Sequence, residues 1–354
     1  MIKYFISEEL MKKSLPLMSL LSLGLIFGGP IDSMNKSATA ASHGKNVNWN
    51  LSTWGKRRAF TEGIEAVSKY VADKSDGHFT IKINYGGTLS KPRENLDGIS
   101  LGAFEAATFC ASYHADKIKL YCFRLPFLPI TNGDVQKAAD LAVYSHPATI
   151  KEMKKWNAKL LMSAALPQYE FMGRGKEPRT IADFKGMRVR ALGGIGKAMK
   201  VIGAVPTTVT APETYRAIET GTVDAAAFAF YSHFSYKINE VSTWRTTNLS
   251  PGSVNCPLVV NIDAYNSLSD KNKKILTDAV DAGYAALDKA YSASIDKYTP
   301  QADKQGIKKI TYSEADLNAF RKAAAQPVWD QWIKEANAVG LPAQELLDLV
   351  KNSK

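Results

Sequence analysis

Hydrophobic and polar positions follow a repeated strand-and-helix order from about residue 47. Alternation of apolar and polar residues predicts strands at 47–51 and 79–83, and an apolar run predicts a buried strand at 104–109. A helical period predicts helices at 57–74 and 92–101 between these strands. This β-α-β-α-β order predicts a mostly parallel sheet with helices on both faces.

The same order begins again in the second half of the chain. The predicted elements there are strands at 159–165, 187–191 and 223–228 and a helix at 196–202. A further helix begins clearly at Thr210, because Glu213 completes a capping box and Pro212 suits the first turn. Gly221 ends this helix.

The two α/β units define the domain organisation. They meet near residue 166, and an apolar segment at 257–262 predicts one more strand, by which the chain returns to the first unit. We therefore expect an α/β fold in which lobe 1 spans 41–165 and lobe 2 spans 166–252. Residues 253–354 are expected to return to lobe 1 and to add a long bridging helix and C-terminal helices.

The bridging helix is predicted from a helical period that runs from 270 to 298 and that Pro300 should stop. At 1.5 Å per residue this helix is about 40 Å long, which is longer than one domain needs. We expect it to brace both lobes. Further amphipathic helix is predicted around Phe320, Val328 and Trp332.

Composition and charge narrow the class of protein. The chain has 354 residues, of which 45% are apolar, and this is enough for about two domains. Its formal net charge of +11 raises the question of a nucleic-acid partner. However, Lys and Arg are dispersed among acidic residues, and the longest basic cluster, 56–58, stands alone. We expect a solvated basic surface and no nucleic-acid partner.

The N-terminus predicts export. A basic stub at 11–13 precedes an apolar run at 15–27, which is shorter than the roughly 20 residues that span a bilayer. A small-residue cleavage site follows at 38–40. We interpret residues 1–40 as a signal peptide and place the mature protein in the periplasm; a retained single-helix anchor is the alternative.

The three cysteines leave two interpretations open. An oxidising compartment permits one disulfide, and Cys110 and Cys122 are the closest pair in sequence. The odd count, which includes Cys256, and the lack of paired spacing favour buried free thiols instead.

Enzyme signatures are absent from the sequence. The five histidines show no metal-ligand spacing with one another or with cysteine, and there is no nucleophile elbow or phosphate-binding loop. Gly193-Gly194-Ile195-Gly196 lacks the full dinucleotide spacing. We therefore expect no catalytic residues and no cofactor, and we identify no metal ligands, although the sequence leaves open whether a metal ion helps to hold a solute.

One residue has the chemistry of an anion site. Arg190 lies at the end of a predicted strand, where open α/β sheets place ligands. Its guanidinium can grip a carboxylate through two parallel hydrogen bonds, and the competing interpretation is a surface salt bridge.

Several motifs together resemble the solute receptors (DctP-type) of tripartite ATP-independent periplasmic (TRAP) transporters. The strand Lys185-Gly186-Met187-Arg188-Val189-Arg190 is similar to a strand of that family. The other matching segments, in chain order, are 86–89, 125–128, 203–206 and 213–225. The resemblance covers nearly the whole mature chain.

The resemblance implies a type II-like periplasmic binding fold, with two lobes that close over an organic acid and a long helix across both. It implies no catalysis, and it implies integral membrane subunits as partners. The family's selectivity arginine falls on Arg190, and a ligand-facing position falls on Phe228. Trp54 and Glu94 fall in loops that border the cleft in relatives, and Asn255 falls in the returning segment.

The solute is expected to be a monocarboxylate or zwitterion rather than a dicarboxylate. Several relatives carry a second arginine at a position that falls on Glu170 here, and an acidic group there would repel a second carboxylate. Arg174 lies close enough in sequence to substitute for the missing group. The alternative interpretation of Glu170 is a surface residue.

Two other functions compete with this hypothesis. A receptor of the same shape can serve an ATP-driven importer or a sensor kinase, and sequence separates these poorly. A periplasmic enzyme on a similar fold is the other alternative, but it would need a general base with a nucleophile or metal, and no such set is visible.

Overall fold

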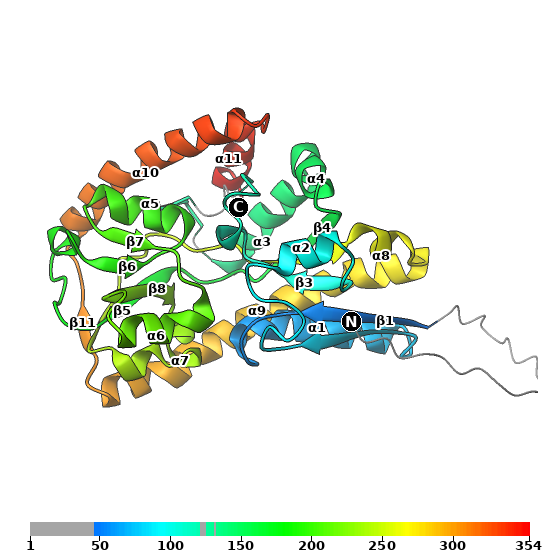
Figure 1. The fold of residues 1–354 in the computed structure, drawn as a ribbon, viewed down its shortest axis with the longest axis horizontal. Helices are drawn as coiled ribbons and strands as arrows, with labels where there is room; N and C mark the ends of the chain where they lie inside the picture. The colour runs from blue at the N-terminus through cyan, green and yellow to red at the C-terminus, as the bar shows by residue number, and fades with distance from the viewer. Residues whose placement is uncertain (1–45, 121–124, 131) are drawn as a thin grey trace, which may run out of the picture. The chain divides into compact units, whose positions relative to one another are not determined.

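A computed structural model describes residues 46–120, 125–130 and 132–354. The predicted signal peptide and Cys122 lie outside these residues. The part from His43 to Lys354 forms one compact unit that contains two sheets, and Figure 1 shows these two sheets in separate regions of the chain. The expectation of an α/β fold with two lobes is confirmed.

The sheet of lobe 1 has five strands. In spatial order they are β2 (Phe79–Asn84), β1 (Val47–Ser52), β3 (Ala106–Thr108), β10 (Pro257–Asn261) and β4 (Ala158–Ser163). The strand β1 is parallel to both β2 and β3, whereas β10 is antiparallel to both β3 and β4.

The sheet of lobe 2 has six strands. In spatial order they are β11 (Lys308–Ile310), β9 (Trp244–Thr246), β5 (Tyr169–Gly173), β8 (Ala225–Ala229), β6 (Arg188–Arg190) and β7 (Val205–Thr207). The strand β6 is parallel to β7 and β8, and β5 is antiparallel to β8 and β9. Within the C-terminal segment, β11 joins this second sheet beside β9.

Both sheets are mostly parallel, as predicted, and each contains one strand that runs opposite to all the others, β10 in lobe 1 and β5 in lobe 2. The antiparallel strands β5 and β10 are the first strands after each crossing between the lobes. The chain leaves lobe 1 at the end of β4 and leaves lobe 2 at the end of β9. In both cases it enters the other sheet at the carboxyl ends of that sheet's parallel strands. It must run in the opposite direction from there.

Helices α1 (Ala59–Lys74) and α9 (Asp270–Lys304) form the most extensive helix pair. They approach closely at two glycines: a Cβ on Gly63 would lie 2.8 Å from Leu287, and one on Gly283 would lie 3.0 Å from Val67. The long helix does not stop at Pro300 as expected but continues to Lys304, because one missing N–H close to the helix end costs little.

The long helix α9 packs on both lobes. Its first half contacts α1 and β4 in lobe 1, and its second half contacts α7 (Phe230–Ser235) in lobe 2. The rings of Phe234 and Tyr298 stack at 4.5 Å between centroids, and those of Tyr231 and Tyr291 at 5.2 Å. Figure 1 shows α9 passing behind both sheets. The predicted bracing helix is confirmed.

The remaining helices cover the sheets and close the C-terminal part. They are α2 (Asn95–Ser100), α3 (Gly133–Ser145), α4 (Pro147–Lys154), α5 (Gly193–Val201), α6 (Thr214–Glu219), α8 (Ile262–Asn266), α10 (Glu314–Asn337) and α11 (Ala343–Lys351). Helix α10 also contacts both lobes: it packs on α5, and Trp332 donates its indole N–H to the carbonyl of Lys119 in lobe 1.

Two segments without regular structure connect the lobes between β4 and β5 and between β9 and β10. Each contains a non-glycine residue in the left-handed region, Ala165 at φ 43° and Ser250 at φ 39°. Such conformations cost energy and persist where the surroundings hold them. We expect these segments to act as the pivots if the lobes move relative to one another.

Cys110 and Cys256 form a disulfide. The expectation of free thiols was therefore wrong for these two residues, and Cys110–Cys122 is not the pair. Cys110 follows β3 and Cys256 precedes β10, and these strands are neighbours in the sheet although the cysteines are 146 residues apart in sequence. Sequence spacing carries no signal of a contact made by such a distant strand pair.

Candidate functional site

A small pocket lies where the lobes meet, at the carboxyl ends of β6 and β8. It is lined by residues of both lobes and of both crossing segments: Trp54, Arg58, Phe60, Cys110, Tyr113, Leu166, Tyr169, Arg190, Leu192, Ala211, Phe228, Tyr231, Ser232, Tyr236, Val254 and Cys256. Its free volume is about 20 Å³, which is room for roughly one water molecule. An organic acid can therefore enter only if the lobes separate or the lining side chains move.

Arg190 is the polar centre of this pocket. Its side chain is almost completely buried, with 1% of its surface exposed. Nη1 donates to the carbonyl of Ala227 at 2.7 Å and Nε donates to that of Val209 at 3.0 Å, which fixes the plane of the guanidinium. Nη2 has only a long contact, 3.4 Å, to the hydroxyl of Tyr113. The guanidinium is thus held on one side and keeps donor capacity on the other.

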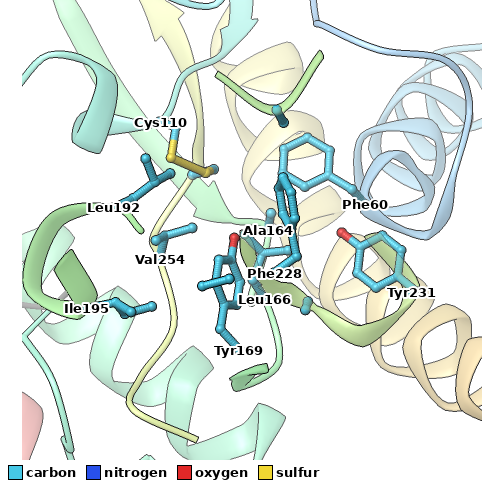
Figure 2. Close-up of a cluster of buried hydrophobic side chains, with 14 of the residues drawn as sticks. Phe60, Cys110, Ala164, Leu166, Tyr169, Leu192, Ile195, Phe228, Tyr231 and Val254 are labelled. Atoms are coloured by element: carbon cyan, nitrogen blue, oxygen red, sulfur yellow. A yellow bond between two sulfur atoms is a disulfide. The ribbon is translucent and has the colours of Figure 1, made fainter. Parts of the chain in front are cut away.

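Aromatic rings surround the guanidinium. The ring of Phe228 lies 3.9 Å from the Arg190 Cζ, in a cation–π arrangement. Tyr236 stacks on Phe228 at 5.8 Å, and Tyr169 lies at 6.2 Å. Figure 2 shows Phe60, Tyr169, Phe228 and Tyr231 converging on one region beside the disulfide of Cys110. These rings exclude water, so charge at Arg190 is weakly screened.

The first loop of lobe 1 contributes Trp54 and Arg58. Trp54 is buried, and its ring packs against Phe60 at 5.4 Å and Tyr113 at 6.0 Å. Arg58 gives Nη1 to the carbonyls of Trp54 and Lys56, and its guanidinium lies over Phe60 at 4.5 Å. Arg58 is therefore a second cation in the pocket, and part of its hydrogen-bonding capacity stabilises the loop to which it belongs.

The electrostatics of the pocket favour an anion. Among the described residues that line it there is no Asp or Glu, whereas Arg58 and Arg190 are both present. Burial raises the pKa of Tyr231 to about 12, so its phenol stays protonated and can donate a hydrogen bond at neutral pH. The described residues include no group of three or more metal-ligating side chains that would hold a metal ion.

Two contacts join the lobes beside the pocket. The Tyr113 hydroxyl of lobe 1 accepts a hydrogen bond from the backbone N–H of Ala211 in lobe 2 at 3.0 Å. Arg93 of lobe 1 donates Nη2 to the carbonyl of Thr208 in lobe 2 at 3.0 Å. These hydrogen bonds form when the two lobes are close together, and they would break if the lobes separated.

Glu170 lies outside the pocket lining. Its carboxylate accepts hydrogen bonds from Thr246 Oγ1, from the Leu249 N–H at 3.2 Å, and from Ser250 N–H and Oγ at 2.9 and 2.8 Å. Burial raises the pKa of this carboxyl group, and the four hydrogen bonds oppose that rise. Glu170 therefore anchors the second crossing segment to β5 in lobe 2.

Three other residues predicted from the sequence are also placed away from the pocket. Asn255 is buried but points toward Asp140 and Tyr144, and its neighbours Val254 and Cys256 line the pocket instead. Arg174 follows the end of β5 that is remote from Tyr169. Glu94 is exposed and accepts from the Lys91 N–H at 2.9 Å in the turn before α2.

Of the seven residues predicted from the sequence, the structure brings together Arg190, Phe228 and Trp54. The sequence did not point to Arg58 or to any of the four tyrosines of the lining, Tyr113, Tyr169, Tyr231 and Tyr236. Tyr113 sits in a short 3₁₀ helix (Ala111–Tyr113) directly after β3, and a polar aromatic residue just beyond a strand end was an available signal. Arg58 was noticed only as part of a basic cluster.

The chain belongs to the bacterial extracellular solute-binding proteins, family 7 (DctP), because the family model matches residues 52–335. This confirms the resemblance to solute receptors of TRAP transporters. In the described part of the chain, no helix has the length and apolar character to cross a membrane.

Two curated relatives show what family members bind. A monocarboxylate 2-oxoacid-binding periplasmic protein of Nostoc is 26% identical over 306 residues, which cover 81% of this chain and 83% of that protein. The ectoine-binding periplasmic protein TeaA of Halomonas elongata is 25% identical over 298 residues, covering 81% and 84%.

Solved structures share the fold. A TRAP solute-binding protein from a marine metagenome, specific for aromatic acids and solved with metahydroxyphenylacetate, has a TM-score of 0.76 at 22% identity, covering 87% of this chain and 98% of that one. A TRAP solute-binding protein of Rhodoferax ferrireducens in complex with benzoate has a TM-score of 0.75 at 18% identity, covering 86% and 97%.

Proposed function

We propose that this chain is a periplasmic receptor that binds a small organic carboxylate between its lobes and delivers it to the membrane subunits of a TRAP-type importer. The observation that carries the proposal is the geometry of Arg190. Its guanidinium is fixed by the carbonyls of Val209 and Ala227 and retains Nη2 for a ligand, in a pocket whose described lining has no acid. A buried charge of this kind gains most from an anionic partner.

The solute class that the pocket fits best is a monocarboxylate with a flat or apolar body. One carboxylate would pair with Arg190, and the rest of the solute would lie against Phe228, Tyr169 and Trp54. The relatives that bind a 2-oxoacid, benzoate or metahydroxyphenylacetate point in the same direction. A dicarboxylate would need a second free guanidinium, and Arg58 already gives Nη1 to two backbone carbonyls.

The account includes no catalysis. The pocket holds two guanidiniums, phenols and apolar side chains, and a receptor needs nothing more than these. Family membership supports a transport role, and the periplasmic location follows from the predicted signal peptide and the family.

A thermal-shift screen tests the proposal. The mature protein would be heated with benzoate, 3-hydroxybenzoate, pyruvate, 2-oxobutyrate, ectoine, succinate and malate. Because a ligand that binds only the folded state stabilises it by mass action, at least one monocarboxylate should raise the melting temperature progressively with concentration. Succinate and malate should have little effect. Tight binding of either C4-dicarboxylate would contradict the proposed solute class.

A further inference from the structure

A second, larger concavity lies outside the solute pocket, between the first loop of lobe 1, α7 and α9. Its volume is about 820 Å³, and five cationic side chains line it: Lys56, Arg57, Arg58, Lys289 and Lys297. We call this concavity the basic groove. Its one acidic lining residue, Glu62, lies 3.6 Å from Arg57.

The cations of the basic groove differ in how far they are already engaged, since Arg57 pairs with Glu65 at 2.6 Å and Arg58 donates to two backbone carbonyls. Lys56 and Lys289 are exposed and take part in no ion pair among the residues that the structure describes. The floor is made of small residues of α9, chiefly Ala286, Ala290 and Ala293. Small residues let another backbone approach the helix closely, so the groove suits a protruding segment of chain better than a flat membrane surface.

The basic groove is built from both lobes. Lys56 and its neighbours precede α1 in lobe 1, and Ser235 lies on α7 of lobe 2. The stretch of α9 between them rests on α7 through Tyr298. Any separation of the lobes must therefore change the width of the groove. Arg58 also lines the solute pocket, so one side chain belongs to both sites.

We propose that the basic groove is a docking site for an acidic, periplasm-facing segment of the importer's membrane subunits, and that it is complete only when the lobes are together. This inference rests on the proposed function. Charge complementarity would supply the attraction, and the two-lobe construction would let the importer favour the loaded receptor over the empty one. A ligand-dependent surface is what a receptor needs if it is to release solute only where it can be transported.

The test uses paired charge reversals. Lys56→Glu with Lys289→Glu alters the groove, and Lys271→Glu with Lys322→Glu is the matched control, because it changes the net charge by the same amount at exposed lysines that do not line the groove. Binding of each receptor to the purified membrane subunits in phosphatidylcholine nanodiscs would be measured by biolayer interferometry, with and without the acid that the thermal screen identifies.

The wild type and the control should bind alike, and the groove variant should bind at least about tenfold more weakly. Added acid should tighten docking of the wild type. Equal weakening by both double variants would show that net charge alone matters and would overturn the proposal, as would unchanged binding of the groove variant. Equal binding of the wild type to empty phosphatidylglycerol nanodiscs would assign the groove to lipid instead.

Calorimetry of the same variants with the acid separates this proposal from the proposed function. If the groove variant keeps its affinity for the acid but loses docking, then Lys56 and Lys289 act in docking and not in holding the acid. If no acid binds the wild type, the proposed function fails, and the docking result without acid still decides whether the groove recognises the membrane subunits.

Discussion

Arg190 shows how one residue can have two roles. Two of its nitrogens donate hydrogen bonds to the carbonyls of Val209 and Ala227, which ties β6 to β8 and to the segment after β7. The third nitrogen faces the pocket. Position at a strand end made this residue a candidate, because open sheets place ligands there, and the family resemblance favoured it over a surface salt bridge. The two backbone partners could not be foreseen, since they depend on how the following loops return to β6.

The two roles predict different results for two substitutions at Arg190. Arg190→Ala removes both, so it should weaken solute binding by well over tenfold and also lower the free energy of unfolding by about 1–3 kcal/mol through the loss of the two hydrogen bonds to backbone carbonyls. Arg190→Lys should weaken binding similarly with a smaller loss of stability, because an ammonium cannot replace the planar fork. Calorimetry and urea unfolding measure the two effects. Unchanged affinity in Arg190→Lys would remove Arg190 from the site.

His233 predicts a pH dependence of stability. It is fully buried behind Phe228, and one ring nitrogen lies 3.0 Å from the carbonyl oxygen of Glu170. Burial lowers its pKa from 6.5 to about 3. Between these two pKa values the unfolded chain binds a proton at this imidazole and the folded chain does not. The free energy of unfolding should therefore fall as the pH drops from 6.5 toward 3. Burial of His114, whose pKa is about 4, acts in the same direction.

Urea unfolding of His233→Gln between pH 4 and 7 measures this contribution. The variant should lose less stability on acidification than the wild type, by up to several kcal/mol, since one pKa unit corresponds to about 1.4 kcal/mol. The same change at the partly exposed His78 serves as the control. An acid-induced loss in His233→Gln equal to that of the wild type would show that the buried imidazole does not control this range.

At the scale of elements, sequence patterns predicted α1, β1 and β2 well, whereas β9 and β11 were missed. Helix α1 and strands β1 and β2 have long periodic patterns, and all three were found within two residues at each end. Strands β9 and β11 have three residues each, which is too short for any period to be seen. Their pairing is imposed by tertiary contact with β5 and with each other.

The packing of α1 on α9 predicts the effect of filling a glycine. A side chain at Gly283 would meet Met162 and Val67 at 2.6 and 3.0 Å, so Gly283→Val should lower the free energy of unfolding by about 1–3 kcal/mol through overpacking. Ala285→Val on the exposed face of the same helix is the control, and it should lower the free energy of unfolding by only a few tenths of a kcal/mol. Equal losses in the two variants would mean that the helices are not closely packed at Gly283.

At the scale of the whole molecule, the account depends on lobes that approach and separate. The Tyr113 hydroxyl touches lobe 2 only when the lobes are together. Tyr113→Phe should therefore destabilise the approximated state and weaken solute affinity by about two- to tenfold, the worth of one hydrogen bond of about 0.5–1.5 kcal/mol. Calorimetry would show the loss. An affinity equal to that of the wild type would mean that this bond does not contribute to closure.

The two-lobe plan itself was readable from the sequence, because the strand-and-helix order begins twice. The site was only partly readable, since it is assembled from segments as distant as Trp54, Phe228 and Val254. A residue such as Asn255 shows the limit: its neighbours line the pocket while its own side chain turns to Asp140. In an irregular segment, a shift of one position decides whether a side chain faces the pocket or faces away from it. No sequence pattern predicts this orientation.

Small-angle scattering of the mature protein, with and without a saturating acid from the thermal screen, tests the central claim most directly. The pocket leaves about 20 Å³ between the lobes as they stand, so an acid must enter an open form and be enclosed as the lobes come together. The account predicts a smaller radius of gyration in the presence of the acid. Scattering curves that are identical with and without a bound acid would contradict it.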